Sequence, residues 1–165
     1  MVIVYMHAGA EGFGADHVTG REEHYLGEDR GNPEAFAHMA IDAGASLVIA
    51  SGPHVLRGMQ FYRGHLIAYS LGNFAGYGNF ATAGDLDLSV ILHVTLSASG
   101  RFEGARIDPI RFTATGRPVP GGGVFPAGRK RARLLSHPLR AVAAGGHGRR
   151  GGRRAALAAD PAGRL

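Results

Sequence analysis

The chain has 165 residues, 45% of them hydrophobic, which is enough for one domain with a buried core. Its net charge of +5 is unevenly distributed: residues 1–120 carry 8 arginines, no lysine and 12 acidic residues, whereas residues 121–165 carry 10 basic residues and 1 acidic residue. The absence of cysteine excludes disulfides and thiolate metal sites. Because the excess positive charge lies in residues 121–165, it does not indicate specific nucleic-acid binding by the folded part. No segment approaches the roughly 20 apolar residues of a membrane span.

The first predicted strand covers residues 2–7. Val2 to Met6 form an unbroken β-branched and aromatic run, which is typical of a strand buried on both faces, and the run begins without the pattern of a signal peptide. The strand ends on His7, a glycine-containing turn follows, and Glu11 comes four residues after the histidine. Taken alone, His7 fits a functional side chain and a backbone-bonded histidine equally well.

Residues 12–32 form a polar loop punctuated by glycines. Loops of this length inside compact domains are uncommon and are often lids or binding segments. Asp16, His17 and His24 are candidate ligands in it, and a solvated acidic loop is the alternative interpretation.

A helix is predicted over residues 33–44 and a second buried strand over residues 47–50. Asn32 suits the N-cap, Pro33 the first turn and Gly44 the stop of the helix. A strand, helix and strand in succession form a right-handed crossover, which makes the two strands parallel.

The second strand leads through a turn at Ser51, Gly52 and Pro53 to His54. Because parallel strands of an open α/β sheet place ligands at their carboxyl ends, we expect His7 and His54 at one edge of the sheet, with Glu11 beside them. The alternative for His54 alone is that it caps the short segment after it.

The remaining elements extend this core. Strands are predicted at 59–62, 65–70, 86–96 and 102–112, the first two as a tight hairpin and the last two as an antiparallel extension of the sheet. Asn73 lies in the turn after the hairpin, where ordinary turn chemistry also explains it.

Residues 114–165 are predicted to form a low-complexity tail rich in Arg, Gly and Ala, disordered because it lacks the apolar residues for a core. Its charge suits nucleic acid or an anionic surface, and a misread frame of a GC-rich coding sequence is the alternative.

Three motifs resemble, in order and spacing, the C-terminal half of the CapA family of bacterial capsule and poly-γ-glutamate synthesis proteins, which are related to calcineurin-like metallophosphoesterases. The motifs are VIVYMHAGAE, IDAGASLVIASGPHVL and YRGHLIAYSLGNF, and the resemblance covers residues 1–113. It implies a partial metallophosphatase-like α/β sandwich: a mixed sheet with one crossover helix and an antiparallel extension.

The resemblance also implies a site. His7 and His54 match the family's histidines as metal ligands, and Glu11 and Asn73 are its nearby polar positions, for a catalytic set of four. Neutral imidazoles suit Mn, Fe or Zn, and a two-metal site would activate water for a hydrolase or transferase acting on an anionic polymer or a phosphorylated or acyl substrate. The implied location is the bacterial cell envelope.

Two departures from the family keep a second class of function open. Ser51 and Gly52 stand where the family often has histidine, and Ala8 stands where it has tryptophan. The family's N-terminal half, with its Gly-Asp turn and Asn-His segment, has no counterpart before Met1. We therefore expect either an enzyme that needs the missing N-terminal half or a non-catalytic fragment or binding protein that retains half of the fold.

Overall fold

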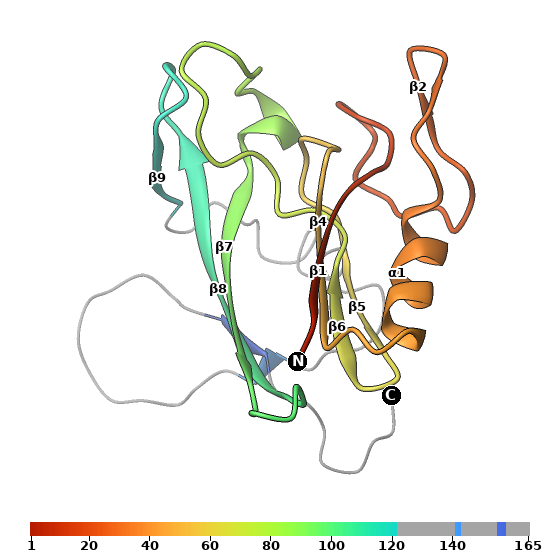
Figure 1. Cartoon of the computed structure of the whole chain (residues 1–165). Helices are drawn as coiled ribbons and strands as arrows, with labels where there is room; N and C mark the ends of the chain where they lie inside the picture. The colour runs from red at the N-terminus through yellow and green to blue at the C-terminus, as the bar shows by residue number, and fades with distance from the viewer. Residues whose placement is uncertain (122–140, 143–154, 158–165) are drawn as a thin grey trace, which may run out of the picture.

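The computed structural model describes residues 1–121, 141–142 and 155–157, and these form a mixed α/β structure (Figure 1). The first sheet has four strands in the order β1-β4-β6-β5. Strands β1 and β4 are parallel, β4 and β6 are parallel, and β5 and β6 are an antiparallel hairpin, so the sheet is mixed. Its strands are β1 (Ile3–His7), β4 (Leu47–Ser51), β5 (Met59–Tyr62) and β6 (His65–Ala68).

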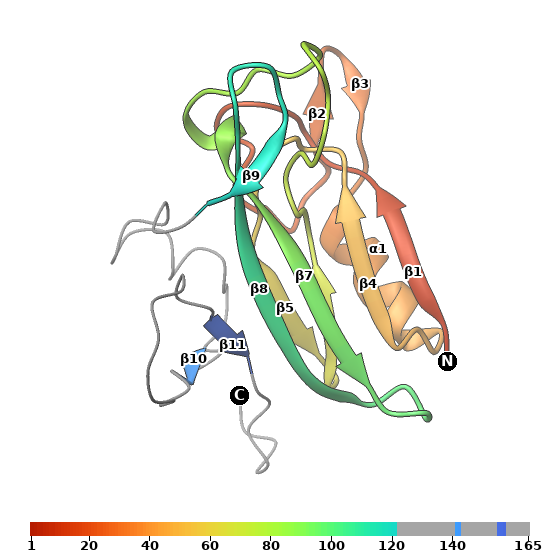
Figure 2. The same cartoon turned by 90° about the vertical axis from the view of Figure 1, so that its left-hand side faces the viewer.

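A second sheet is built on β8, which pairs antiparallel with β7 along one edge and with β9 and β11 along the other. We predicted β7 and β8 as an extension of the first sheet, and that was wrong: they form a separate sheet that faces it (Figure 2). The strands are β7 (Ser89–Leu96), β8 (Phe102–Phe112), β9 (Pro118–Pro120), β10 (Ala141–Val142) and β11 (Ala155–Leu157).

The apolar residues of the two sheets pack against each other to form the main core. Leu47, Met59 and Leu66 of the first sheet are buried in one cluster with Val90 and Phe102 of the second. The apolar alternation along β7 explains this packing, because every second residue points to one face of a strand and must be covered there. Packing against the first sheet removes the apolar face of β7 from water. As a continuation of the first sheet, β7 would lie beside that sheet and could not pack on it.

Helix α1 (Pro33–Asp42) covers the other face of the first sheet, so the layers run helix, sheet, sheet (Figure 1). The predicted N-cap is confirmed: the Asn32 Oδ1 atom accepts a hydrogen bond from the Ala35 amide at 3.0 Å. The buried residues of the helix are Pro33, Ala37 and Ile41, whereas Phe36 is 43% exposed.

Strand β1 differs most from its prediction. We expected it to be buried on both faces, yet Ile3 is 52% and Tyr5 67% exposed, and only Met6 is buried. Within the described residues β1 pairs with β4 alone, and it lies beyond the area that β7 and β8 cover (Figure 2). Its apolar composition therefore reflects a face and an edge that nothing in the described part of the chain covers.

The polar loop after β1 contains a short hairpin, β2 (His24–Tyr25) and β3 (Glu28–Asp29), that periodicity did not reveal. The strand predicted to begin at residue 86 begins at Ser89, after a 3₁₀ turn, η1 (Gly84–Asp87). No helix in the described residues is long and apolar enough to span a membrane.

The segment predicted to be disordered, 114–165, lies mostly outside the described residues. Its described parts are not irregular: β9 pairs with Ile110–Phe112 of β8, and β11 pairs with Ala105–Ile107. Strand β9 thus lies beyond the predicted boundary at residue 113, because the edge of β8 offers hydrogen bonds that hydrophobic content does not reveal. The division of the chain at that residue stays a prediction.

Candidate functional site

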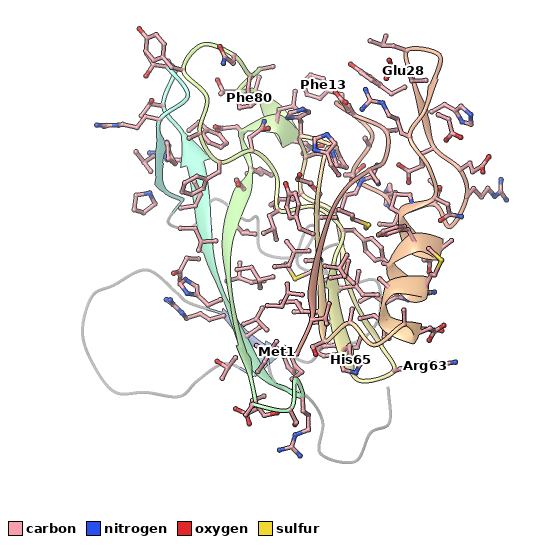
Figure 3. The ribbon with its side chains drawn as sticks, in the orientation of Figure 1. Met1, Phe13, Glu28, Arg63, His65 and Phe80 are labelled. Atoms are coloured by element: carbon pink, nitrogen blue, oxygen red, sulfur yellow. The ribbon has the colours of Figure 1, made fainter. Side chains whose placement is uncertain are left out.

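The candidate site lies at the carboxyl ends of β1 and β4. The parallel register pairs His7 with Ser51, so both strands leave the sheet at one level. Phe13, Glu28 and Phe80 lie at this end of the molecule, and Met1, Arg63 and His65 lie at the opposite end (Figure 3).

His54 occupies a left-handed backbone conformation, with φ of +59°. A non-glycine residue in this region is uncommon, and an observed case is a reasonable starting point for a functional hypothesis. The neighbours Pro53 and Val55 are buried and fix the turn on both sides, while the His54 side chain remains 35% exposed. The turn thus presents the imidazole to solvent at the edge of the sheet.

Asn73 orients that imidazole. Its Oδ1 atom lies 2.6 Å from His54 Nδ1, and because an amide oxygen can only accept, Nδ1–H donates; in the neutral ring this leaves the lone pair on Nε2. The Nδ2 atom of Asn73 is buried and has no hydrogen-bond partner among the described residues. Phe80 packs on the imidazole, with 5.2 Å between ring centres.

Glu11 approaches the free side of the ring. Its Oε2 atom lies 3.9 Å from His54 Nε2, and its Oε1 atom forms an ion pair with Arg30 Nη1 at 2.8 Å. Arg30 is itself held by Glu28 and by the face of the Tyr25 ring. The β2–β3 hairpin therefore supplies a cation that fixes one oxygen of Glu11 and leaves the other facing His54.

His7 has different neighbours. Its Nδ1 atom lies 3.4 Å from Ser51 Oγ, which also contacts the Tyr5 hydroxyl. The ring is exposed, and it passes close to the backbone at Gly52. The structure thus joins three of the four predicted residues, Glu11, His54 and Asn73, by direct contacts, and it places His7 on the adjacent strand end.

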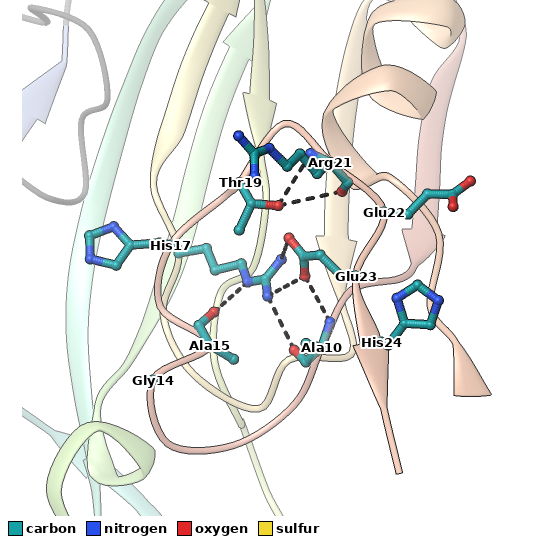
Figure 4. A pocket seen from close by; sticks show the side chains of 10 residues that line it. Ala10, Gly14, Ala15, His17, Thr19, Arg21, Glu22, Glu23 and His24 are labelled. Carbon is teal, nitrogen blue, oxygen red and sulfur yellow. Dashed lines mark hydrogen bonds and ion pairs between the residues drawn. The ribbon is translucent and has the colours of Figure 1, made fainter. Parts of the chain in front are cut away.

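The loop histidines, our alternative ligands, lie around a separate hollow of about 440 Å³. Figure 4 shows His17 and His24 on opposite sides of it, with Glu23 between them. None of the four predicted site residues lines this hollow.

A divalent metal ion fits the kind of atoms present at the site. A neutral Nε2 atom whose other nitrogen donates to Asn73 is the usual state of a metal-binding histidine, and Glu11 offers a carboxylate oxygen close by. The number of ligands is low, however: within the described residues no group of three or more His, Asp or Glu side chains is placed to hold one ion. Catalytic metal sites usually have three protein ligands.

Sequence reasoning missed three charged residues near this site: Glu23, Arg30 and Arg57. Arg57 carried a signal that could have been used, because it interrupts the apolar run Val55 to Met59 and would need a buried partner there. Glu23 and Arg30 carried no such sequence signal, because they lie in a loop that contains many charged residues.

These features define the class: a mixed α/β protein with a histidine and a carboxylate at the carboxyl edge of a parallel strand pair. Residues 1–77 match the family model described as "Bacterial capsule synthesis protein PGA_cap". The chain is 34% identical to the "PGA biosynthesis protein CapA" of Bacillus subtilis (strain 168) over 86 residues, which are 52% of this chain and 22% of that protein. It is 40% identical to the "Capsule biosynthesis protein CapA" of Bacillus anthracis over 52 residues, 32% of this chain and 13% of that protein.

The resemblance to the CapA family of bacterial capsule synthesis proteins is therefore confirmed for residues 1–77, which are part of the chain. All three motifs that carry the resemblance lie within these residues. The matched segments cover 22% and 13% of the length of the two relatives.

Proposed function

We propose that this chain supplies part of a metal-dependent hydrolase or transferase site to a CapA-type protein of capsule or poly-γ-glutamate synthesis. The observation that carries the proposal is the Asn73–His54–Glu11 arrangement, in which Asn73 orients the imidazole and the His54 Nε2 atom faces a carboxylate. The family match supports the biological role. The helix–sheet–sheet layering is compatible with the metallophosphatase-like sandwich that the resemblance implies.

In this proposal His54 and His7 bind a divalent metal such as Mn, Fe or Zn, alone or as one of a pair. A bound metal of this type supplies Lewis acidity and a water nucleophile near neutral pH. Asn73 holds the tautomer of His54, and its free Nδ2–H group is available to an oxygen of an anionic polymer or of a phosphorylated or acyl substrate. Glu11 is available to accept a proton or to bind the metal.

The remaining ligands come, in this proposal, from the family's N-terminal half, acting at the cell envelope. The open edge of β1 supports this partner, because it lies next to the site and exposes Ile3 and Tyr5. A strand added there would end beside His7 and cover apolar surface at the same time.

The proposal is tested by titrating the full chain with Mn²⁺ and following solvent relaxation. We expect weak binding that is lost in His54→Ala and His7→Ala and retained in His93→Ala, a control on the outer face of the second sheet, where His93 contacts Asp108. Binding should weaken as pH falls, because only neutral imidazole is a ligand. Binding that survives both substitutions but is lost in His17→Ala and His24→Ala would contradict the proposed site.

The second candidate is a non-catalytic fragment or binding protein. The observation that favours it is the low ligand count in the described part of the chain. No detectable Mn²⁺ binding by the wild type would support this candidate and leave His7 and His54 without a metal role.

A further inference from the structure

A buried ion pair lies next to the candidate site. Arg57 is 1% and Glu23 4% exposed in their side chains, and the Arg57 Nη2 atom donates to Glu23 Oε2 at 2.7 Å, with Nη1 at 3.2 Å from Oε1. Both charges are thus removed from water and paired by a two-point contact. The two residues are 34 apart in the sequence, so the pair joins the loop to the segment that follows β4.

The same two side chains hold the loop backbone on either side of Glu11. Arg57 Nη2 donates to the Ala10 carbonyl at 3.1 Å, and Arg57 Nε donates to the Ala15 carbonyl at 2.7 Å. Glu23 Oε2 accepts from the Ala10 amide at 2.8 Å. Figure 4 shows these contacts as dashed lines that converge on Glu23, Ala10 and Ala15.

Backbone hydrogen bonds link Arg57 and the Glu11 loop to the segments that carry the other site residues. The Arg57 amide donates to the Ser70 carbonyl, three residues before Asn73. The Gly12 amide donates to the carbonyl of Pro53, the residue before His54. The ion pair therefore contacts or adjoins each of the three segments that carry Glu11, His54 and Asn73.

Stability alone is a poor explanation for such a pair. Desolvating two charges costs about as much as their attraction returns, and apolar residues of similar volume often stabilise a protein as well or better. An apolar pair cannot form directional hydrogen bonds, so it could not hold the two carbonyls and the amide in fixed positions as Arg57 and Glu23 do.

We infer that Arg57 and Glu23 are positioning residues that fix the Glu11 loop against His54 and Asn73. This inference rests on the proposed function, because the position of Glu11 affects catalysis only if that site is catalytic. The ion pair does not touch a substrate; it acts through the backbone at Ala10 and Ala15. Losing it leaves the core intact and releases the segment that carries Glu11.

The test uses the full chain with Glu23→Leu and Arg57→Met combined, which removes both charges and leaves neither unpaired. The matched control is Asp42→Leu with Arg63→Met, an ion pair of 3.0 Å whose side chains are 42% and 68% exposed. Hydrogen exchange is measured by NMR at the amides of Gly9 and Gly12, whose bonds to Arg30 and Pro53 involve neither substituted side chain. Amides of Val48 and Ile67, in the first sheet, serve as the core reference.

We expect protection at Gly9 and Gly12 to fall about tenfold or more in the double variant while the core amides and the thermal midpoint change little. A role in stability alone would lower protection at all four amides together, and that result, or unchanged protection at Gly9 and Gly12, would overturn the inference. If the double variant does not fold, Arg57→Lys is used, because it keeps the charge and loses the fork that reaches both carbonyls. The same selective loss is expected there.

A second readout separates this inference from the proposed function. Where the wild type binds Mn²⁺, the double variant should bind about tenfold more weakly with an unchanged fold, and the control pair should bind as the wild type does. Equal binding by the double variant and the wild type would contradict the positioning role. If the wild type binds no Mn²⁺, the proposed metal function fails, and the exchange experiment still decides whether the pair positions the loop.

Discussion

At the scale of single residues, the site depends on backbone conformations that side-chain chemistry alone does not predict. His54 takes a left-handed φ of +59° between two buried neighbours. Gly9 has a φ of +97°, and a Cβ atom there would lie 2.6 Å from Arg57 Nη1 and 3.0 Å from Glu23 Oε2. The glycine in the motif after β1 is therefore needed for the close approach of the ion pair as well as for the turn.

Gly9→Ala should lower the free energy of unfolding by about 2 kcal/mol or more, because it adds a steric clash to the strain of a left-handed alanine. Gly12→Ala is the matched control: its φ is +85° and an added Cβ would meet nothing within 4 Å, so it reports the backbone strain alone. Urea unfolding of both variants measures the difference. Equal losses in the two variants would show that the ion pair tolerates the extra carbon atom.

At the scale of elements, helix α1 is held at its N-terminus by one side chain with two contacts. Asn32 Oδ1 caps the Ala35 amide, and Asn32 Nδ2 donates to the Gly20 carbonyl at 3.0 Å. The first contact satisfies a free amide of the first turn, and the second ties the polar loop to the helix. The residue that starts the helix thus also orders the loop that supplies Glu11 and Arg30.

Asn32→Ala should cost about 1 kcal/mol of stability, the ordinary value for loss of an N-cap, and should increase proteolytic cleavage of the loop. Thermal unfolding and limited proteolysis measure the two effects. Asn79→Ala is the control, because Asn79 is exposed in another loop. Loss of stability without faster cleavage would mean that the bond to Gly20 does not order the loop.

At the scale of the whole molecule, the second sheet packs on β4, β5 and β6 of the first sheet and leaves β1 uncovered. Its exposed side chains include Ile3 at 52% and Tyr5 at 67%, and Val2, directly before the strand, is 56% exposed. An apolar strand at a free edge favours pairing with another strand, and natural proteins usually protect such edges. Among the described residues, nothing pairs with this edge of β1.

Ile3→Lys combined with Tyr5→Lys should leave the thermal midpoint nearly unchanged, since both side chains are more than half exposed, and should reduce self-association. Light scattering as a function of concentration measures the effect. Ile91→Lys, at a position 37% exposed on the second sheet, should not reduce self-association. A lower midpoint for the double variant would show that these residues pack in solution against another part of the chain.

Local patterns were sufficient to predict most elements, and three motifs carried the resemblance to the CapA family. The parallel crossover, the β5–β6 hairpin and the capped helix follow from period-2 and period-3.6 apolar spacing and from the turn residues beside them, which are properties of short segments. The selection of His54, Glu11 and Asn73 as candidate site residues came from motifs and the resemblance. The structure places the three in contact, and their functional role stays a prediction.

Only the tertiary structure decided which apolar faces are covered and which charges meet. Periodicity predicts that Val90 and Leu92 share a covered face but not what covers it, so the second sheet and the exposure of β1 were missed. The Glu23–Arg57 pair joins residues 34 apart in sequence, and such pairing depends on a fold that no local spacing encodes. The physical reason is that burial and charge pairing are properties of contacts between distant segments, whereas hydrogen-bonded strands and helix caps are set by neighbours in the chain.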